Sequence, residues 1–406
     1  MKVLLIDVNC KNSSTGKIVY DLYTAINETG NEAAVCYGRG ENIHEKNIFK
    51  FGIDIETYIH ALLTRITGFT GCFSPFSTFR LIRFVKKFKP DVVHIHELHA
   101  YFVNIKPLIN YLKKNKIQTV MTLHCEFAYT GKCGHSVECE KWQTECGDCP
   151  HLKDYPSTLF FDHTKFMFNQ KKKLFEDFDN LTIVTPSKWL AERAKQSFLK
   201  NKDVRVIHNG IDTDVFSPKN TSALRTMHNI TDDEKIVLAV APNLMSGNKG
   251  GKYVLELADR MKEQNVRFVL IGVDEEMTSE NNNVILLHRI YDKELLAQYY
   301  SLADVFVICS ERENFPTTCI ESQCCGTPVC GFDVGGVKET ILNDYALCDY
   351  GDIDGLMHNV AKILESHNSS GKTSIAGKAA FYFGKNNMFR QTFDLYTSNN
   401  QFGECR

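Results

Sequence analysis

Short, uniformly apolar segments alternate with amphipathic ones along most of the chain, and this alternation restricts the possible folds more than any other feature. A strand that is apolar at nearly every position is typical of a parallel sheet covered by helices on both faces. Strands that are regularly separated by crossover helices predict an α/β protein with doubly wound, Rossmann-like sheets. The expected strands lie at 2–8, 90–97, 118–125, 181–187, 204–210, 235–242, 267–273, 283–289, 304–310 and 326–332.

The alternation breaks down once, in a polar, proline-containing segment at 211–235. A chain of 406 residues exceeds the size at which a single hydrophobic core usually stops growing, so two domains are expected. We expect them to face a cleft, because open α/β sheets bind ligands at the carboxyl ends of their strands. The predicted parts are a first domain at 1–215 with a cysteine-rich insert at 125–156, a second domain at 216–385, and a C-terminal helix and tail at 386–406, for which a return to the first domain is one option.

Charge and hydrophobicity exclude several partners and locations. With 47 basic and 49 acidic side chains the net charge is -2, which gives no overall electrostatic basis for binding nucleic acid. The longest apolar runs, 267–273 and 304–309, are far shorter than the ~18–20 residues of a membrane-spanning helix. The opening apolar run breaks at Asp7 without a cleavage-site pattern, so it is interpreted as a strand and not as a signal peptide. We therefore expect a cytoplasmic protein.

The segment 310–339 contains the pattern of an anion-binding site. Its predicted helix begins after Pro316, and the backbone amides of Thr317 and Thr318 at the start of that helix can bind a negative charge together with the helix dipole. Glu313 precedes the helix and Glu321 lies inside it, so the two carboxylates can flank one ligand, the first at sugar hydroxyls and the second at a ribose diol. The alternative is that Glu321 only complements the helix dipole and Glu313 is solvated.

Several segments of the chain resemble one enzyme family. Glu313 and Glu321 with NFPTTCI between them, followed by GTPV and VGGVKE, resemble the donor-site signature of the retaining glycosyltransferases of family 4, which have the GT-B fold. Further similar segments are VTPSKWLAE at 184–192, VIHNGIDTDVFSP at 206–218 and NKGGKYVLELA at 248–258. Within that family the chain resembles the branch that builds colanic acid, capsule and O-antigen.

The resemblance implies the reaction and its partners. A sugar would pass with retention from a nucleotide-diphospho-sugar, UDP- or GDP-linked, to a lipid-linked glycan acceptor in surface polysaccharide biosynthesis, and no cofactor would be needed for catalysis. Two alternative functions remain open. One is a nucleotide-sugar epimerase or hydrolase of the same fold, and the other is a non-catalytic protein that binds sugar nucleotides.

The resemblance also assigns roles to donor-site residues. Lys249 matches the basic residue that grips the donor diphosphate, whereas Asn243 stands where a partner arginine is usual. Glu313 would be catalytic, as a nucleophile or as a residue that positions the sugar. Thr317, Thr318 and Glu321 would bind the rest of the donor.

In the first domain the resemblance points to one glycine and three histidines. Gly16 in SSTGK matches a glycine loop that lets the donor phosphate or the acceptor approach, although a helix cap also explains this motif. His124 matches the catalytic histidine that contacts the transferred sugar. His96 and His99 lie in a segment similar to acceptor-side loops. A histidine at a strand end can otherwise be purely structural.

Four cysteines gather within the insert. They are Cys133, Cys139, Cys146 and Cys149, and they belong to 15 cysteines in a chain without an export signal, which favours reduced thiols. Four thiolates can close a tetrahedral structural zinc site in a segment too short and polar to form a core. Disulfides and buried free thiols are the alternatives, and Cys125 and His135 are spare ligands.

A basic amphipathic segment at 79–89 places arginines and lysines among phenylalanines. Such a helix can lie on an anionic membrane surface, where lipid-linked acceptors reside. The alternative is a helix that covers a sheet and turns a solvated basic face outward.

Overall fold

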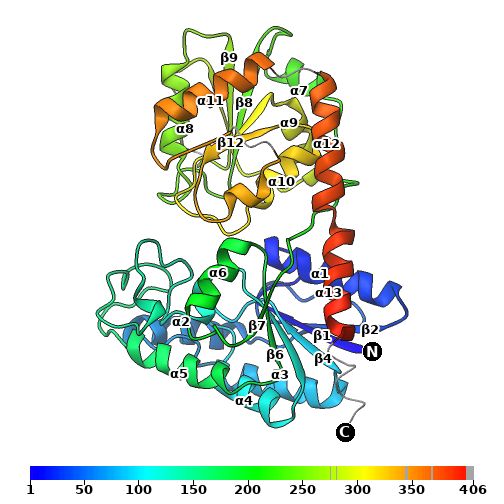
Figure 1. The fold of residues 1–406 in the computed structure, drawn as a ribbon, viewed down its shortest axis with the longest axis vertical. Coiled ribbons are helices and arrows are strands. Elements are labelled where there is room, and N and C mark those ends of the chain that lie inside the picture. The colour runs from blue at the N-terminus through cyan, green and yellow to red at the C-terminus, as the bar shows by residue number, and fades with distance from the viewer. Residues whose placement is uncertain (275, 280, 343–345, 367–368, 399–406) are drawn as a thin grey trace. The chain divides into compact units, whose positions relative to one another are not determined.

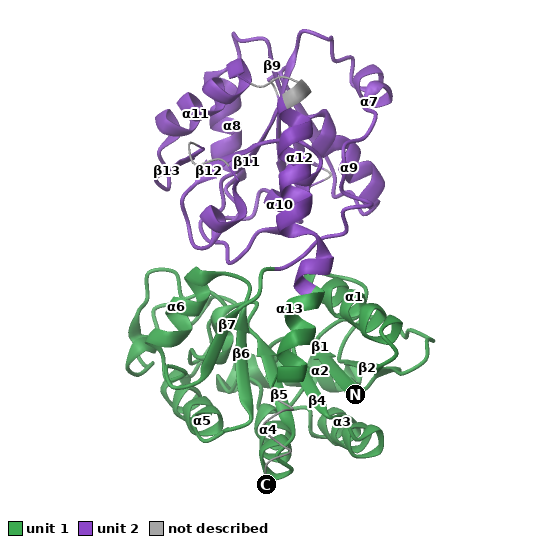
Figure 2. Cartoon of the chain, turned by 45° about the vertical axis from the view of Figure 1, so that its right-hand side comes forward, with its two compact units in different colours: residues 1–208, 389–406 green, residues 209–388 purple. Residues whose placement is uncertain are grey.

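The structure is a computed structural model that describes residues 1–274, 276–279, 281–342, 346–366 and 369–398. The chain forms two compact units, one of residues 1–208 with 389–406 and one of residues 209–388 (Figure 2). Each unit contains one parallel sheet with helices, so the predicted doubly wound α/β architecture is confirmed. The predicted tail at 399–406 lies outside the described residues.

The first unit is built on a seven-stranded parallel sheet in the order β3-β2-β1-β4-β5-β6-β7. Strands β2 and β3 were not expected, because β3 has only 3 residues and β2 contains two alanines between turn residues. The strands are β1 Lys2–Asp7, β2 Glu32–Tyr37, β3 Ile48–Lys50, β4 Val92–Ile95, β5 Gln118–Thr122, β6 Leu181–Thr185 and β7 Asp203–Val206. The helices are α1 Ser14–Glu28, α2 Asp54–Thr67, α3 Pro75–Phe88, α4 Ile105–Lys114, α5 Thr164–Glu176 and α6 Lys188–Gln196.

The second unit is built on a six-stranded parallel sheet in the order β10-β9-β8-β11-β12-β13. Its strands are β8 Lys235–Val240, β9 Val266–Ile271, β10 Val284–Leu287, β11 Val305–Ile308, β12 Val329–Phe332 and β13 Leu347–Cys348. Its helices are α7 Ser222–Met227, α8 Gly251–Arg260, α9 Lys293–Leu302, α10 Thr317–Cys324, α11 Ile353–Ser366 and α12 Ser369–Phe383. The last helix, α13 Lys385–Ser398, begins in this unit and belongs to the first unit from Phe389 onward.

The uniformly apolar strands explain why each sheet is covered on both faces. In β8, Ile236 and Leu238 pack into a core with α9, α10 and α12. Val237 and Ala239, which alternate with them, pack into a second core with α8 and α11 on the other face (Figure 1). Because successive side chains of a strand point to opposite faces, both sets must be apolar.

The strand order reverses at one point in each sheet. In the first unit the chain runs outward from β1 to β3 and then returns to the other side of β1 with β4. In the second unit the same reversal lies between β8 and β11. Ligands of open α/β sheets bind outside the carboxyl ends of the strands at such a switch point, because the two loops there diverge. The loops after β1, β4, β8 and β11 are therefore the first places to look for a site.

None of the helices in the described part of the chain combines the length and the apolar composition that crossing a bilayer requires. The segment at 79–89 forms most of α3, whose Leu81, Val85 and Phe88 are buried. Its basic residues Lys86 and Lys87 are exposed. The structure thus gives this helix the arrangement of a sheet-covering helix.

Candidate functional site

Two residues from the switch-point loops of the second unit form an ion pair. Lys249 lies in the loop after β8 and Glu313 in the loop after β11. The Lys249 Nζ atom is 2.5 Å from Oε1 of Glu313, and the side chains are 29% and 17% exposed. Both charges are therefore confined but still accessible from solvent. The structure brings together two predicted site residues that are 64 positions apart.

Backbone packing fixes the loop that carries Lys249. The amide of Glu311 donates a hydrogen bond to the carbonyl of Asn248 over 3.0 Å. Gly250 has a φ of +72°, and a Cβ atom at this position would lie 1.9 Å from the carbonyl oxygen of Cys309. Only a glycine allows the loop to approach the end of β11 so closely. The Lys249–Glu313 pair is therefore a consequence of how the two backbones meet.

A second glycine fixes Glu313. Gly335 has a φ of +58°, and a Cβ atom there would lie 2.0 Å from the carbonyl oxygen of Glu313. The next amide, that of Gly336, donates a hydrogen bond to the same oxygen over 2.9 Å. The two glycines thus hold the backbone of Glu313 in place.

The start of α10 lies directly after the Glu313 loop. Thr317 and Thr318 occupy its first turn and are partly exposed. Pro316 precedes them as the N-cap and has no side-chain acceptor for their amides. On the same helix, Glu321 accepts a hydrogen bond from the hydroxyl of the buried Tyr300 over 3.1 Å. Sequence reasoning missed Tyr300, because it comes from α9 and its spacing is that of an ordinary core residue.

The predicted histidines of the first unit also meet at a switch point. His96 follows β4 and His124 follows β5, and their ring nitrogens Nδ1 and Nε2 are 3.2 Å apart. His99 Nε2 lies 3.2 Å from Oε2 of Glu97. His94, inside β4, contacts the hydroxyl of Tyr396 over 2.6 Å and that of Thr122 over 2.7 Å. These side chains form one polar cluster, in which His94 and His96 are buried and His99 and His124 are half-buried.

The cluster contains both neutral and charged groups. Burial lowers the pKa of His124 to about 4 and that of His94 to about 3, so both rings are neutral at neutral pH. His99 differs: although burial works against its charge, the carboxylate of Glu97 raises the pKa of His99 well above its usual value. The pKa of Glu97 is lowered, because the charge of His99 outweighs the effect of burial. His99 and Glu97 are therefore an ion pair.

Sequence reasoning missed Asp7 and Glu97. Asp7 ends β1 and is buried, and its Oδ2 atom accepts a hydrogen bond from the hydroxyl of Thr15 over 3.0 Å. Burial, followed by the charge of Glu97, raises the pKa of Asp7 to about 7. The available signal was the same for both: an acidic residue at or just beyond the end of an apolar strand.

Gly16 is buried in the first turn of α1, and its amide donates a hydrogen bond to Oγ of Ser13 over 3.1 Å. Ser13 is the N-cap of the helix. A Cβ atom on Gly16 would lie 3.1 Å from the carbonyl carbon of Asn9, so the loop after β1 folds back on itself here. In the structure the SSTGK motif therefore caps the start of α1.

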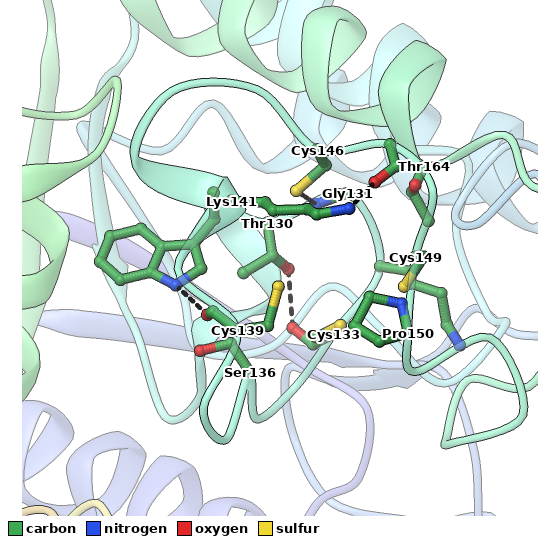
Figure 3. Close-up of a pocket in the computed structure, with 13 residues that line it drawn as sticks. Thr130, Gly131, Cys133, Ser136, Cys139, Lys141, Cys146, Cys149, Pro150 and Thr164 are labelled. Atoms are coloured by element: carbon green, nitrogen blue, oxygen red, sulfur yellow. Dashed lines mark hydrogen bonds between the residues drawn. The ribbon is translucent and has the colours of Figure 1, made fainter.

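Two groups of side chains in the described part of the chain consist of residue types that ligate metals. The ligand atoms of Glu97, His99 and Cys125 lie within 4.8 Å of one another. Separately, the four cysteines of the insert line a single small cavity (Figure 3). The spare ligand Cys125 therefore belongs to the histidine cluster, whereas the other four cysteines form a group of their own.

Comparison with known proteins assigns the chain to a family. The profile described as Glycosyltransferase Family 4 matches residues 15–215, and the profile described as Glycosyl transferases group 1 matches residues 220–380. The putative colanic acid biosynthesis glycosyl transferase WcaC of Escherichia coli strain K12 is 26% identical over 259 residues, 62% of this chain and 62% of the relative. The chain thus spans less than two thirds of the length of this curated relative.

Two solved structures share the fold. Sucrose-phosphate synthase of Thermosynechococcus elongatus has a TM-score of 0.69 at 17% identity, with 98% of this chain and 99% of that chain covered. HepE of Anabaena in complex with UDP has a TM-score of 0.66 at 16% identity, with 98% and 100% covered. Since the two profiles match in order along two Rossmann-like units, the chain belongs to glycosyltransferase family 4 and has the GT-B fold.

Proposed function

We propose that the protein is a retaining glycosyltransferase that moves a sugar from a nucleoside-diphosphate sugar to a hydroxyl of a lipid-linked glycan in surface polysaccharide biosynthesis. The observation that carries the proposal is the Lys249–Glu313 ion pair beside the start of α10. The similarity to a colanic acid glycosyl transferase and to a structure with bound UDP supports it.

The ion pair is suited to binding a diphosphate. An incoming diphosphate would take Lys249 from Glu313, and the first-turn amides of Thr317 and Thr318 would bind further phosphate oxygens. These groups would stabilise the negative charge that develops on the leaving group, which is the task of a metal ion in other transferases. We therefore expect no catalytic metal.

The same exchange would release Glu313 to act on the sugar. Its backbone stays fixed by Gly335 and Gly336, so its carboxylate can hold the sugar hydroxyls in one orientation. Glu321, oriented by Tyr300, would bind the ribose diol. In the first unit, His124 would contact the transferred sugar as a neutral ring, and His96 and His99 would lie on the acceptor side.

An unusual helix supports a lipid-linked acceptor at the inner face of the cytoplasmic membrane. In α2 the polar residues Glu56, Thr57, His60 and Thr64 are buried. The opposite face is exposed and apolar, and we call it the α2 apolar face. It consists of Ile55, Tyr58, Ile59, Leu62 and Ile66, which are between 38% and 71% exposed.

Specific hydrogen bonds hold α2 in this inverted orientation. The carboxylate of Glu56 accepts from the amides of Phe76 and Ser77, over 2.8 and 2.7 Å, at the start of α3. His60 Nδ1 lies 2.8 Å from Oγ of Ser74. Because these partners anchor the polar face inward, the apolar face must point to solvent.

The α2 apolar face extends into a neighbouring loop. The amide of Leu159 donates a hydrogen bond to the carbonyl of Arg65 near the end of α2, and Phe160 and Phe161 follow with exposed rings. Arg65, which precedes Ile66 directly, is also exposed. Exposed apolar side chains next to a basic residue are typical of a surface that binds anionic membranes.

Titration of the purified protein with UDP and with GDP in a calorimeter tests the donor site. We expect one nucleotide to bind, and Lys249→Ala to weaken its binding by at least about tenfold, since a charge-assisted contact to phosphate is lost. Lys252→Ala, which changes an exposed lysine three residues further on, should bind as the native protein does. Absence of binding by both nucleotides would contradict the proposed donor site.

A transfer assay with a UDP- or GDP-linked sugar tests the role of Glu313. We expect Glu313→Ala to abolish transfer and to leave nucleotide binding unchanged or tighter, because Lys249 loses its competing partner. Survival of transfer in this variant would show that the assignment is wrong. Turnover of the donor without any acceptor would favour an epimerase or hydrolase.

A further inference from the structure

Four cysteines from one irregular segment surround a cavity of about 20 Å³. The segment has no strand, and its only helix-like element is the 3₁₀ turn at Lys141–Gln143. Trp142 forms one wall, and Figure 3 shows Cys133, Cys139, Cys146 and Cys149 arranged around the hollow. A water molecule needs about 10–15 Å³ of such space, so the cavity has the size of one water or one ion. Four sulfurs around a space of this size suit a single soft metal ion.

A backbone amide points at one of the four sulfurs. The amide of Gly131 donates to Sγ of Cys146 over 3.2 Å. The sulfurs of Cys133 and Cys149 lie near each other. Amide donors of this kind orient thiolate ligands and stabilise their charge around a metal ion.

Two lysines place positive charge beside the sulfurs. Nζ of Lys132 donates to the carbonyls of His151 and Leu152, over 2.6 and 2.8 Å. Nζ of Lys171 donates to the carbonyls of Phe127 and Thr130, over 2.6 and 3.0 Å. Both lysines are buried. Burial lowers the pKa of Lys171 to about 7, so a nearby negative charge is needed to keep this lysine fully protonated at neutral pH. A divalent ion with four thiolates has a net charge of about −2 and would supply that charge.

We propose that Cys133, Cys139, Cys146 and Cys149 bind one Zn²⁺ ion as a tetrahedral structural site. Zinc is the divalent ion that four thiolates most commonly hold in a closed site. A tetrahedron with Zn–S bonds of about 2.3 Å needs sulfurs about 3.8 Å apart. In the described part of the chain no three of the four sulfurs lie within 4.8 Å of one another, so binding an ion requires the sulfurs to move closer together.

The zinc site would order the segment next to the histidine cluster. Glu126, which follows Cys125 directly, accepts hydrogen bonds of 2.6 Å from the amide of Ser136 and from Nε of Arg193. The segment between the zinc ligands is therefore tied to the end of β5, where His124 lies. The ion itself has all four positions filled by cysteine and acts in structure, not in catalysis.

The metal content of the intact protein tests the proposal. The full chain, purified under reducing conditions, should contain one zinc per chain by elemental mass spectrometry. Titration with a thiol-specific mercurial should release that zinc in step with the loss of free thiols. With Co²⁺ in its place, the protein should show the thiolate-to-cobalt charge-transfer absorption of a tetrahedral tetrathiolate site. These measurements need no variant and so do not depend on a variant's folding.

Variants then locate the ion. Cys146→Ser should lose zinc, whereas Cys348→Ser, at a half-buried cysteine of the second unit, should retain it. Cys125→Ala should also retain it, because Cys125 belongs to the other group. Loss of zinc in Cys125→Ala, a metal-free native protein, or a Cys133–Cys149 disulfide found in reduced preparations by peptide mapping would each overturn the proposal.

Discussion

Asp7 is a buried acid that keeps its proton up to about neutral pH. Its pKa is raised from 3.8 to about 7, by burial first and by the charge of Glu97 second. A raised folded-state pKa contributes stability that is fully present below the unfolded-state value and is lost as the pH rises through the folded-state value. The contribution of Asp7 is therefore present below pH 3.8 and disappears by about pH 7.

Asp7→Asn should remove this pH dependence, because the amide stays neutral. We expect the variant's free energy of unfolding, relative to the native protein, to rise between about pH 4 and 7 by up to about 4 kcal/mol. Denaturant unfolding across this range measures the difference. If the free energies of unfolding of the two proteins change with pH in parallel, Asp7 ionises at its usual pKa.

Single residues of the site were predictable where they mark strand ends or helix starts. Lys249, Glu313 and His124 follow apolar strands, and the topology brings such positions together. Their pairings were not predictable, because the Lys249–Glu313 contact joins two loops that are 64 residues apart. The Glu97–His99 pair is local in sequence, but its charged state depends on how far both side chains are buried, which the sequence does not give.

At the scale of elements, α2 shows where periodicity fails. An apolar stripe at helical spacing normally indicates the buried face, but here Ile59 and Leu62 point to solvent while Glu56 and His60 are inside. The polar face is buried because it caps α3 and bonds Ser74, and these partners are remote in sequence. Strand periodicity was more reliable, since the strands of both switch points lie where the apolar segments predicted them.

The α2 apolar face should bind anionic lipid vesicles. We expect the double variant Ile59→Ser, Leu62→Ser to bind phosphatidylglycerol vesicles at least about tenfold more weakly in a sedimentation assay, because burying each side chain is worth about 1.5–3 kcal/mol. Nucleotide binding should not change. Met227→Ser, at an exposed apolar residue of the second unit, is the control. Equal sedimentation of all three proteins would contradict a membrane role.

At the scale of the whole molecule, the chain returns to its first unit through α13. Phe389, Phe393 and Tyr396 of α13 line a cavity of about 180 Å³ with Leu22 and Ile26 of α1. Tyr396 is fully buried and bonds His94 inside the sheet. The sequence left a return of the C-terminal helix to the first domain as one option. The residues of α1 and β4 that this helix contacts could not be deduced from the sequence.

Tyr396→Phe should destabilise the first unit. The variant leaves a buried nitrogen of His94 without its hydroxyl partner, which costs about 1–3 kcal/mol. Both tryptophans of the chain, Trp142 and Trp189, lie in the first unit, so their fluorescence reports its unfolding. We expect a lower thermal midpoint by this probe.

A matched control exists in the second unit. Tyr299 bonds His228 there over 2.8 Å, so Tyr299→Phe removes the same kind of contact. It should leave the tryptophan midpoint unchanged. An unchanged midpoint in Tyr396→Phe would mean that α13 adds little to the first unit.

Because α13 returns to the first unit, that unit can be completed only after the second unit has been synthesised. Residues 1–208 are synthesised before residues 209–388, and the part of α13 that belongs to the first unit, from Phe389 onward, follows only after them. Until then Leu22 and Ile26 of α1 lack the α13 side chains that line a cavity with them. A fragment that stops after His208 therefore represents a nascent intermediate, and a faithful first unit for laboratory work needs residues 389–398 joined back to it.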